Sequence, residues 1–254
     1  VRAAGARGVC VPWGGGTTGR TWGFRGLAGD DRGNGGVGGG QGEGARPAPG
    51  ARAPPRDLLA AHPETAYFWG RVAGDGDLTG ERVRVRAAEE SVARRLAAIA
   101  GDDGRLAGER TVERPYAHDA SLARVEDEYT VKVFGGAADR AAAAFGLPID
   151  GTDGGYRLDA LADHDRQLLR GLIEAAGTVC FRESEGVVGV SFVHEARPLL
   201  EWVREALADH GFGSDELSET SSGGYWFGVA DTDTAAFGEW VYEGSDATGL
   251  YADD

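Results

Sequence analysis

The spacing of apolar residues changes several times between residue 56 and the end of the chain. In some stretches an apolar residue recurs every three or four positions, which is typical of an amphipathic helix, and in others every second position, which is typical of a half-buried strand. The predicted helices cover residues 63–73, 89–100, 137–145, 165–175, 198–208 and 234–242. The predicted strands cover residues 81–86, 110–116, 129–134, 179–182, 187–193 and 225–229. Each half therefore reads helix, hairpin, helix, hairpin, helix, which predicts an α+β fold of two repeated units at 56–150 and 151–254.

Residues 1–55, called the leader below, show no hydrophobic period. They contain 18 of the 43 glycines and 5 of the 9 prolines, and their seven arginines and three acids give them a charge of +4. A stretch such as 33–44 buries too little apolar surface to offset the entropy of ordering it, and its glycine spacings lack the flanking strand and helix of a dinucleotide site. We expect a disordered leader whose removal leaves the stability unchanged.

The charge of the chain bears on its partners. With 41 acids against 26 Lys and Arg residues the net charge is -15, so residues 56–254 carry -15 - 4 = -19. This balance argues against nucleic acid or an anionic membrane as a partner. Lys132 is the single lysine, however, and a composition so rich in arginine and acids is typical of haloarchaeal proteins that work in molar salt. The Debye length there is about 3 Å, which weakens the objection to DNA.

Several other classes of protein are disfavoured. No apolar run is long enough for a membrane span or a signal peptide, so we expect a soluble, cytoplasmic protein. Cys10 and Cys180 lie too far apart in sequence to indicate a disulfide framework or a zinc site. Trp202, Trp226 and Trp240 are expected in the core rather than on a base-stacking platform. The histidines lack metal-ligand spacing and are expected at the surface or at caps: His62, His118, His164, His194 and His210.

The first helix of each half ends in a related string of nine residues. These strings are FWGRVAGDG at 68–76 and LRGLIEAAG at 169–177, so their closing glycines are 101 residues apart. A strand tyrosine follows 53 residues after the first string and 48 residues after the second. The strings resemble the LAGLIDADG motif of homing endonucleases, and the resemblance extends over about residues 63 to 250, including the run YWFGVAD that begins at Tyr225.

This resemblance implies a particular architecture. Two LAGLIDADG-like units with saddle-shaped antiparallel sheets would pack about their paired motif helices, in a monomer with internal pseudo-two-fold symmetry. Small residues at positions three and seven of the motif would form the helix interface, namely Gly70, Gly74, Gly171 and Ala175. Position two carries the large residues Trp69 and Arg170, so we expect looser or tilted packing there.

The resemblance also implies a chemistry at position eight. In the family each motif carries an acid there, and the two carboxylates hold divalent metals such as Mg²⁺ at the scissile phosphates. Position eight is Asp75 in the first string but Ala176 in the second. Glu174 is a weak substitute, because two residues correspond to about 200° around a helix. Asp75 is a candidate catalytic residue and metal ligand, or alternatively a carboxylate that caps the turn.

Basic residues on the predicted strands are candidates for DNA contact. Arg82, Arg84 and Arg86 share one strand face, and Lys132 alternates with valines on another strand. Arg110, Arg114 and Arg182 also fall on predicted strands. The arginine fork suits phosphate and guanine. The alternative is that these arginines pair with the abundant acids across the surface.

The sequence therefore predicts a double-stranded DNA-binding protein related to LAGLIDADG homing endonucleases, deficient in cleavage because of Ala176. Two alternatives stay open. One is an active or nicking Mg²⁺-dependent endonuclease that uses Asp75, and the other is a scaffold or interaction protein that does not bind nucleic acid.

Overall fold

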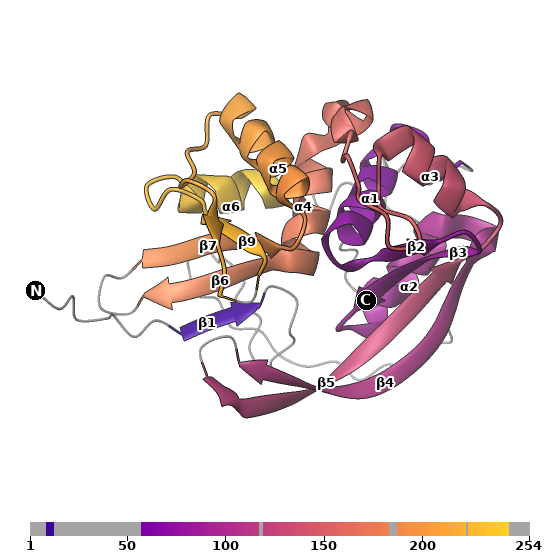
Figure 1. Cartoon of the computed structure of the whole chain (residues 1–254), viewed down its shortest axis with the longest axis horizontal. Helices are drawn as coiled ribbons and strands as arrows, with labels where there is room; N and C mark the ends of the chain where they lie inside the picture. The colour runs from indigo at the N-terminus through magenta and orange to yellow at the C-terminus, as the bar shows by residue number, and fades with distance from the viewer. Residues whose placement is uncertain (1–8, 13–56, 117–118, 183–186, 222, 244–254) are drawn as a thin grey trace, which may run out of the picture.

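The computed structural model describes residues 9–12, 57–116, 119–182, 187–221 and 223–243. They form two units, each with helices packed on one face of an antiparallel sheet (Figure 1). This is the α+β architecture predicted from the sequence, and both units follow the predicted order of helix, hairpin, helix, hairpin, helix.

Unit one is a four-stranded sheet with three helices. Its sheet has the order β2-β3-β5-β4, and all its pairs are antiparallel. The alternation along β3 buries Val83, Val85 and Ala87 against the helices and turns the intervening arginines away from them. The elements are α1 (Pro63–Asp75), β2 (Asp77–Thr79), β3 (Arg82–Ala87), α2 (Glu90–Ala100), the 3-10 turn η1 (Gly101–Asp103), β4 (Gly104–Tyr116), β5 (Asp119–Val133) and α3 (Ala137–Phe145).

Unit two repeats this arrangement. The order β6-β7-β9-β8 matches that of unit one strand for strand. Its core contains Phe192 and Phe227, whose rings stack 5.3 Å apart. The elements are η2 (Leu158–His164), α4 (Asp165–Ala176), β6 (Gly177–Arg182), β7 (Val187–His194), α5 (Arg197–Asp209), β8 (Ser218–Glu219), β9 (Tyr225–Gly228) and α6 (Thr234–Tyr242).

A fifth strand, β1 (Val9–Pro12), comes from the leader and pairs antiparallel with β6. The expectation of disorder is therefore wrong for these four residues. The rest of the leader, residues 1–8 and 13–55, lies outside the described residues.

The two motif helices cross in close backbone contact between the sheets (Figure 1). A Cβ at Gly70 would lie 2.1 Å from the carbonyl oxygen of Leu168, and one at Gly171 would lie 2.2 Å from that of Tyr67. These contacts are reciprocal, since 67 and 168, like 70 and 171, are 101 residues apart. Neither residue could carry a side chain without separating the helices.

The expected loosening at position two is not found. Trp69 and Arg170 are both fully buried, yet the backbones still meet closely at Gly70 and Gly171. Trp69 donates its indole N–H to the carbonyl oxygen of Leu58 at 2.8 Å and packs edge-on to Phe68. The large side chains therefore leave the close approach of the glycines undisturbed.

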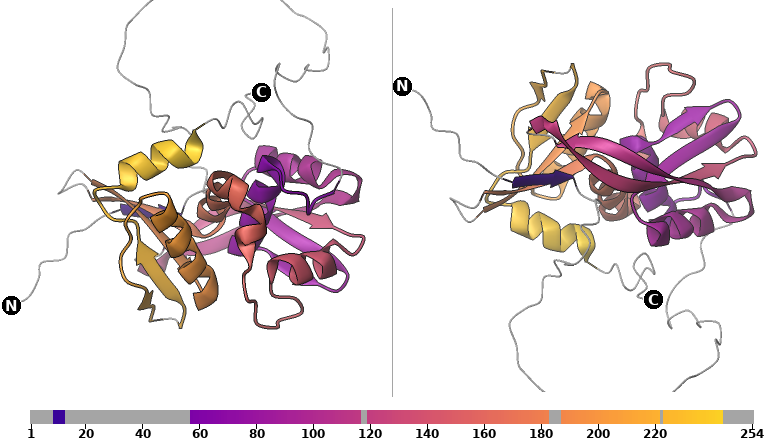
Figure 2. Two further views of the ribbon diagram at one scale, coloured as in Figure 1. Left: turned by 90° about the horizontal axis from the view of Figure 1, so that it is seen from above. Right: turned by 90° about the horizontal axis from the view of Figure 1, so that it is seen from below.

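The long hairpin of unit one differs most from the prediction. Strands β4 and β5 span 13 and 15 residues, much more than the predicted 110–116 and 129–134. Seen from below, this ribbon extends from the first sheet toward the second unit (Figure 2, right). The sequence of its outer part is rich in charged residues and has no regular alternation of apolar residues, so the pattern does not mark its full length.

The tryptophans divide between core and surface. Trp202 and Trp240 are partly buried and pack against the core, as expected. Trp226 is 40% exposed, so its prediction as a core residue is wrong. The reason is its place on β9, next to the buried Phe227 on the opposite face. No helix within the described ranges has the length and apolar character needed to cross a membrane.

Candidate nucleic-acid interface

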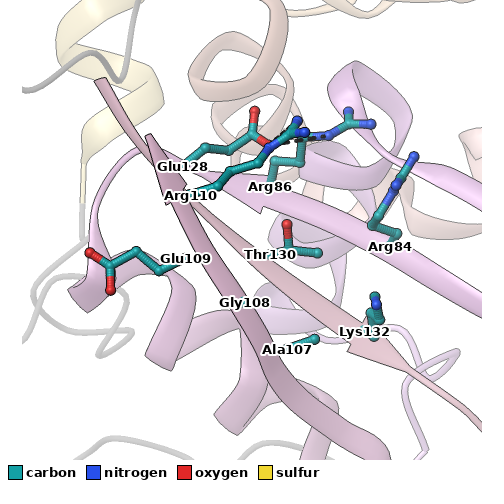
Figure 3. A pocket seen from close by; sticks show the side chains of 9 residues that line it. All are labelled: Arg84, Arg86, Ala107, Gly108, Glu109, Arg110, Glu128, Thr130 and Lys132. Atoms are coloured by element: carbon teal, nitrogen blue, oxygen red, sulfur yellow. Dashed lines mark hydrogen bonds and ion pairs between the residues drawn. The ribbon is translucent and has the colours of Figure 1, made fainter. Parts of the chain in front are cut away.

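The face of the first sheet that lacks helices carries a cluster of basic side chains. Arg84 faces Lys132 across the β3–β5 pair, and Arg86 faces Thr130. These four side chains line a shallow hollow together with Arg110 (Figure 3). Three separate strands thus bring to one surface the residues that the sequence could only assign to strands.

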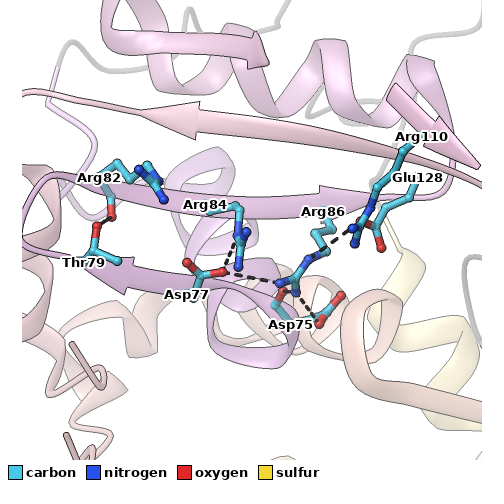
Figure 4. Close-up of polar contacts among 8 residues, drawn as sticks. All are labelled: Asp75, Asp77, Thr79, Arg82, Arg84, Arg86, Arg110 and Glu128. Atoms are coloured by element: carbon cyan, nitrogen blue, oxygen red, sulfur yellow. Dashed lines mark hydrogen bonds and ion pairs between the residues drawn. The ribbon is translucent and has the colours of Figure 1, made fainter. Parts of the chain in front are cut away.

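The arginines of this face are paired with acids (Figure 4). Arg84 Nε lies 2.5 Å from Asp77 Oδ2, and Arg82 Nη1 lies 3.8 Å from Glu81 Oε2. Pairing with surface acids, the alternative considered from sequence, therefore occurs. It leaves the arginines within reach of a ligand, since the side chain of Arg82 is intermediate in exposure and that of Arg84 more exposed.

Arg110 shows how an ion pair can still present a positive surface. Its Nη2 lies 2.6 Å from Glu128 Oε1, yet the side chain of Arg110 is 65% exposed while that of Glu128 is only 5% exposed. The acid therefore lies beneath the guanidinium and orients it. A ligand approaching from solvent meets the N–H donors first.

Asp75, the last residue of α1, lies at the edge of this cluster. Arg86 Nη1 donates to its carboxylate Oδ1 and to its main-chain oxygen, both at 2.8 Å. The Asp75 carboxylate also acts on His194 of unit two. Burial lowers the pKa of His194, and the negative charges of Glu195 and Asp75 oppose that shift. Asp75 thus serves as an ion-pair partner of the neighbouring strand.

The equivalent place in unit two has no charge. Asp77 pairs with Arg84 in unit one, and continuing this register brings Asp75 opposite Arg86. In unit two Gly177 pairs with Phe192. Continuing this antiparallel register by one residue brings Ala176 opposite Val193. Both members of the ion pair are therefore replaced by apolar residues.

Glu174 belongs to a buried network at the helix crossing. Tyr67 donates its hydroxyl to Glu174 Oε2 at 2.6 Å, Tyr242 donates to Oε1 at 3.3 Å, and Arg71 Nη1 lies 3.7 Å from Oε2. Burial raises the pKa of Glu174, against the attraction of Arg71. Because its carboxylate is buried in the helix interface and bonded there, Glu174 has a structural role and is not a metal ligand candidate.

The network also includes cations and rings that were not identified from sequence. Arg170 is fully buried, and its guanidinium carbon lies 6.0 Å from the ring centroid of Tyr67 and 5.8 Å from that of Tyr242. A signal existed in the sequence, since Arg71, Arg170 and Glu174 are charged residues within the mostly apolar nine-residue motif strings. It gave no indication of which residues meet, because the partners are about 70 to 107 residues apart.

For two of the arginines expected to contact DNA, the structure describes the strand but not the side chain. Arg114 lies on β4 and Arg182 on β6, and the structure describes the backbone of both strands but not these two side chains.

Comparison with known proteins identifies the family. The family model LAGLIDADG_4, described as "Putative archaeal homing endonuclease", matches residues 45–254. The chain belongs to this family. Among curated proteins, none matches the sequence.

Several solved structures align with this chain at low sequence identity. Mesophilic variants of the homing endonuclease I-DmoI align with a TM-score of 0.47 at 14% identity, over 73% of this chain and 97% of theirs. I-DmoI in complex with DNA and Mn gives 0.45 at 14% identity, over 74% and 98%. Full-length DUF199/WhiA from Thermotoga maritima gives 0.46 at 12% identity, over 73% of this chain and 59% of that longer one.

The LAGLIDADG motifs of this chain do not fit a pair of catalytic metals. Ala176 offers no side-chain ligand atom, and the Asp75 carboxylate is engaged by Arg86. Within the described ranges, no group of three or more His, Cys, Asp and Glu side chains is placed to hold a metal ion.

Proposed function

We propose that this LAGLIDADG protein binds double-stranded DNA without cleaving it. The observation that supports this most is the basic face of the first sheet, where Arg84, Arg86, Arg110 and Lys132 line one hollow on the side away from the helices. A second unit of the same topology lies beside it, so the two sheets together could contact a long stretch of duplex.

The arrangement of this face suits a nucleic-acid backbone. Guanidinium groups present parallel N–H donors that match phosphate oxygens and the O6 and N7 edge of guanine. Their acid partners hold them in place before binding, which reduces the side-chain entropy lost on association. Duplex DNA therefore supplies anionic oxygens where the protein already directs donors.

The proposed lack of cleavage follows from position eight. Metal-assisted displacement requires ligands for the metals on both sides of the scissile groups, and Ala176 removes the ligand of unit two. An active or nicking endonuclease would need another acid near Asp75. Arg86 engages the Asp75 carboxylate, and the same guanidinium contacts the nearby acid Asp77, so both carboxylates are taken up in ion pairs.

The proposal is tested by measuring DNA affinity as a function of salt. Replacement of Arg82, Arg84 and Arg86 together by alanine should weaken binding of a fluorescent duplex and lower the slope of log Kd against log salt by up to about 2.7, which is about 0.9 for each phosphate that is no longer neutralised. The matched control replaces Arg94, Arg140 and Arg197, exposed arginines on three helices, and changes the net charge equally. Equal affinities of the two variants would contradict the proposed face, and a wild type that binds no duplex even at low salt would favour a scaffold.

A further inference from the structure

The second sheet has an apolar patch on its helix-free face, where the first sheet is basic. Val193 is 43% exposed and Trp226 is 40% exposed, and the two are cross-strand partners in the β7–β9 pair. Their neighbours Phe192 and Phe227 are buried on the helix side. Because side chains alternate along a strand, Val193 and Trp226 point away from the helices.

The strand registers show which residues of unit one this patch replaces. In unit one Asp77 faces Arg84, and in unit two Thr178, 101 residues later, faces Ser191. Ser191 therefore occupies the place of Arg84. Two residues further along the strand, Val193 occupies the place of Arg86.

The next strand continues the pattern. Arg84 faces Lys132 across the first sheet, whereas Ser191 faces Gly228 across the second. At three matched positions, two arginines and a lysine have become serine, valine and glycine. Neither β7 nor β9 contains an arginine or a lysine.

An acid makes this face still less suited to phosphate. A Cβ at Gly228 would lie 2.8 Å from Oδ2 of Asp215, so that carboxylate lies beside the strand on the helix-free side. A carboxylate repels the DNA backbone but tolerates base edges, and it accepts a hydrogen bond from the amino group of cytosine. The face therefore suits the floor of the major groove better than its phosphate walls.

We propose that Val193 and Trp226 read the C5-methyl groups of thymine, so that the two units recognise their halves of one duplex by different chemistry. This inference rests on the proposed DNA binding. In the major groove the thymine methyl is the apolar feature that distinguishes T·A from the other pairs, and apolar side chains recognise it by contact. Unit one would read phosphate and guanine, and unit two would read thymine. The small residues Ser191 and Gly228 leave room for base edges beside Trp226.

The test uses duplexes in which deoxyuridine replaces thymine, which removes the methyl group and keeps the base pair. A tight-binding duplex is first selected from a random library with the wild-type protein. Replacing the thymines of one half-site should then weaken binding by about four-fold for each methyl group that the patch no longer touches. Replacing those of the other half-site should have little effect.

Protein variants connect the effect to the patch. In Val193→Ser and in Trp226→Ala, deoxyuridine should cause a smaller loss of affinity than in the wild type, because each variant lacks one of the two side chains that contact methyl groups. Val188→Ser is the matched control: Val188 is 40% exposed on the same strand but on the opposite face by alternation, so its dependence on the methyl groups should equal that of the wild type. Melting temperatures of all three should stay close to the wild-type value, since the side chains are exposed.

Three outcomes would overturn the inference. If the wild type binds thymine and deoxyuridine duplexes equally well, the recognition of methyl groups is contradicted and the proposed function is unaffected. Variants at the patch that bind DNA normally but lose association with a protein show that this face serves a protein partner instead. A wild type that binds no duplex at all removes both the inference and the function on which it rests.

Discussion

Arg86 holds Asp75 at two points, with Nη1 2.8 Å from the carboxylate Oδ1 and 2.8 Å from the main-chain oxygen. The same guanidinium lies 3.4 Å from Asp77 Oδ2. The charge at the end of α1 is therefore balanced within unit one. The counterpart of the Asp75–Arg86 ion pair in unit two is a pair of apolar residues. The two motif ends that face each other in the family's catalytic centre are therefore charged in one unit and uncharged in the other.

The first prediction concerns cleavage and the charge of Asp75. With Mg²⁺ or Mn²⁺ the protein should leave supercoiled plasmid intact on a gel. Asp75→Asn should bind duplex as well as the wild type or a few-fold more tightly, because it removes a negative charge beside the basic face and keeps an oxygen for Arg86. Glu201→Gln, the same change on exposed α5, is the control. Plasmid linearisation that disappears in Asp75→Asn would instead identify an active endonuclease.

The second prediction concerns the helix crossing. Gly70→Leu and Gly171→Leu should each destabilise the protein by about 1–3 kcal/mol or more, since a side chain at either site meets a backbone carbonyl. Chemical denaturation measures the loss. Gly238→Ala on α6 is the matched control, because a Cβ there meets nothing within 4 Å and alanine favours the helix by up to about 1 kcal/mol. Wild-type stability of both leucine variants would show that the helices do not cross at these glycines.

The third prediction is a dependence of stability on pH. Burial raises the pKa of Glu174, so the folded protein binds this proton more tightly than the unfolded chain does. Its contribution to the free energy of unfolding is therefore full below the ordinary carboxyl pKa and is lost as the pH rises through the raised pKa. The wild-type free energy of unfolding minus that of Glu174→Gln should fall with rising pH, by at most about 1.4 kcal/mol per pH unit.

Urea denaturation at a series of pH values measures this difference, in which the other titrating groups cancel. Glu201→Gln, the same substitution at an exposed position on α5, is measured alongside as the control. A difference that is flat or rising for Glu174→Gln would contradict the burial of an ionisable carboxyl at the crossing.

The fourth prediction revises the expected role of the leader. Deletion of residues 1–12 should lower the melting temperature by a few degrees, because it removes β1 and exposes the edge of β6. Deletion of residues 1–8 keeps the strand and should cost little. Identical melting temperatures for both truncations and the full chain would show that the leader is dispensable, as its composition alone suggests.

The sequence predicts the helices and the repeat well because their signals are local. The glycines of both motifs mark the crossing, and the reciprocal contacts of Gly70 and Gly171 follow the 101-residue repeat. The same holds for β3, where the alternation of apolar and basic residues is enough to place Arg84 and Arg86 on one face.

Contacts between distant segments leave no comparable signal. The burial of Glu128 under Arg110 depends on the pairing of β4 with β5, and the exposure of Trp226 depends on which face of β9 meets the helices. The strand β1 is four residues in a glycine-rich stretch, and only its partner β6 distinguishes it from the residues around it.

The hydrogen bond from Tyr67 to Glu174 runs in one direction only. The residues 101 positions away from these two are Leu168 and Ala73, which cannot form the mirror-image bond. If the chain were divided into two separate polypeptides, a pair of first halves would bury the Tyr67 hydroxyl without its acceptor, and a pair of second halves would bury the Glu174 carboxylate without its donor. Both self-pairings carry the cost of unsatisfied buried polar groups. The two halves should therefore assemble as a heterodimer, each selecting the other over a copy of itself.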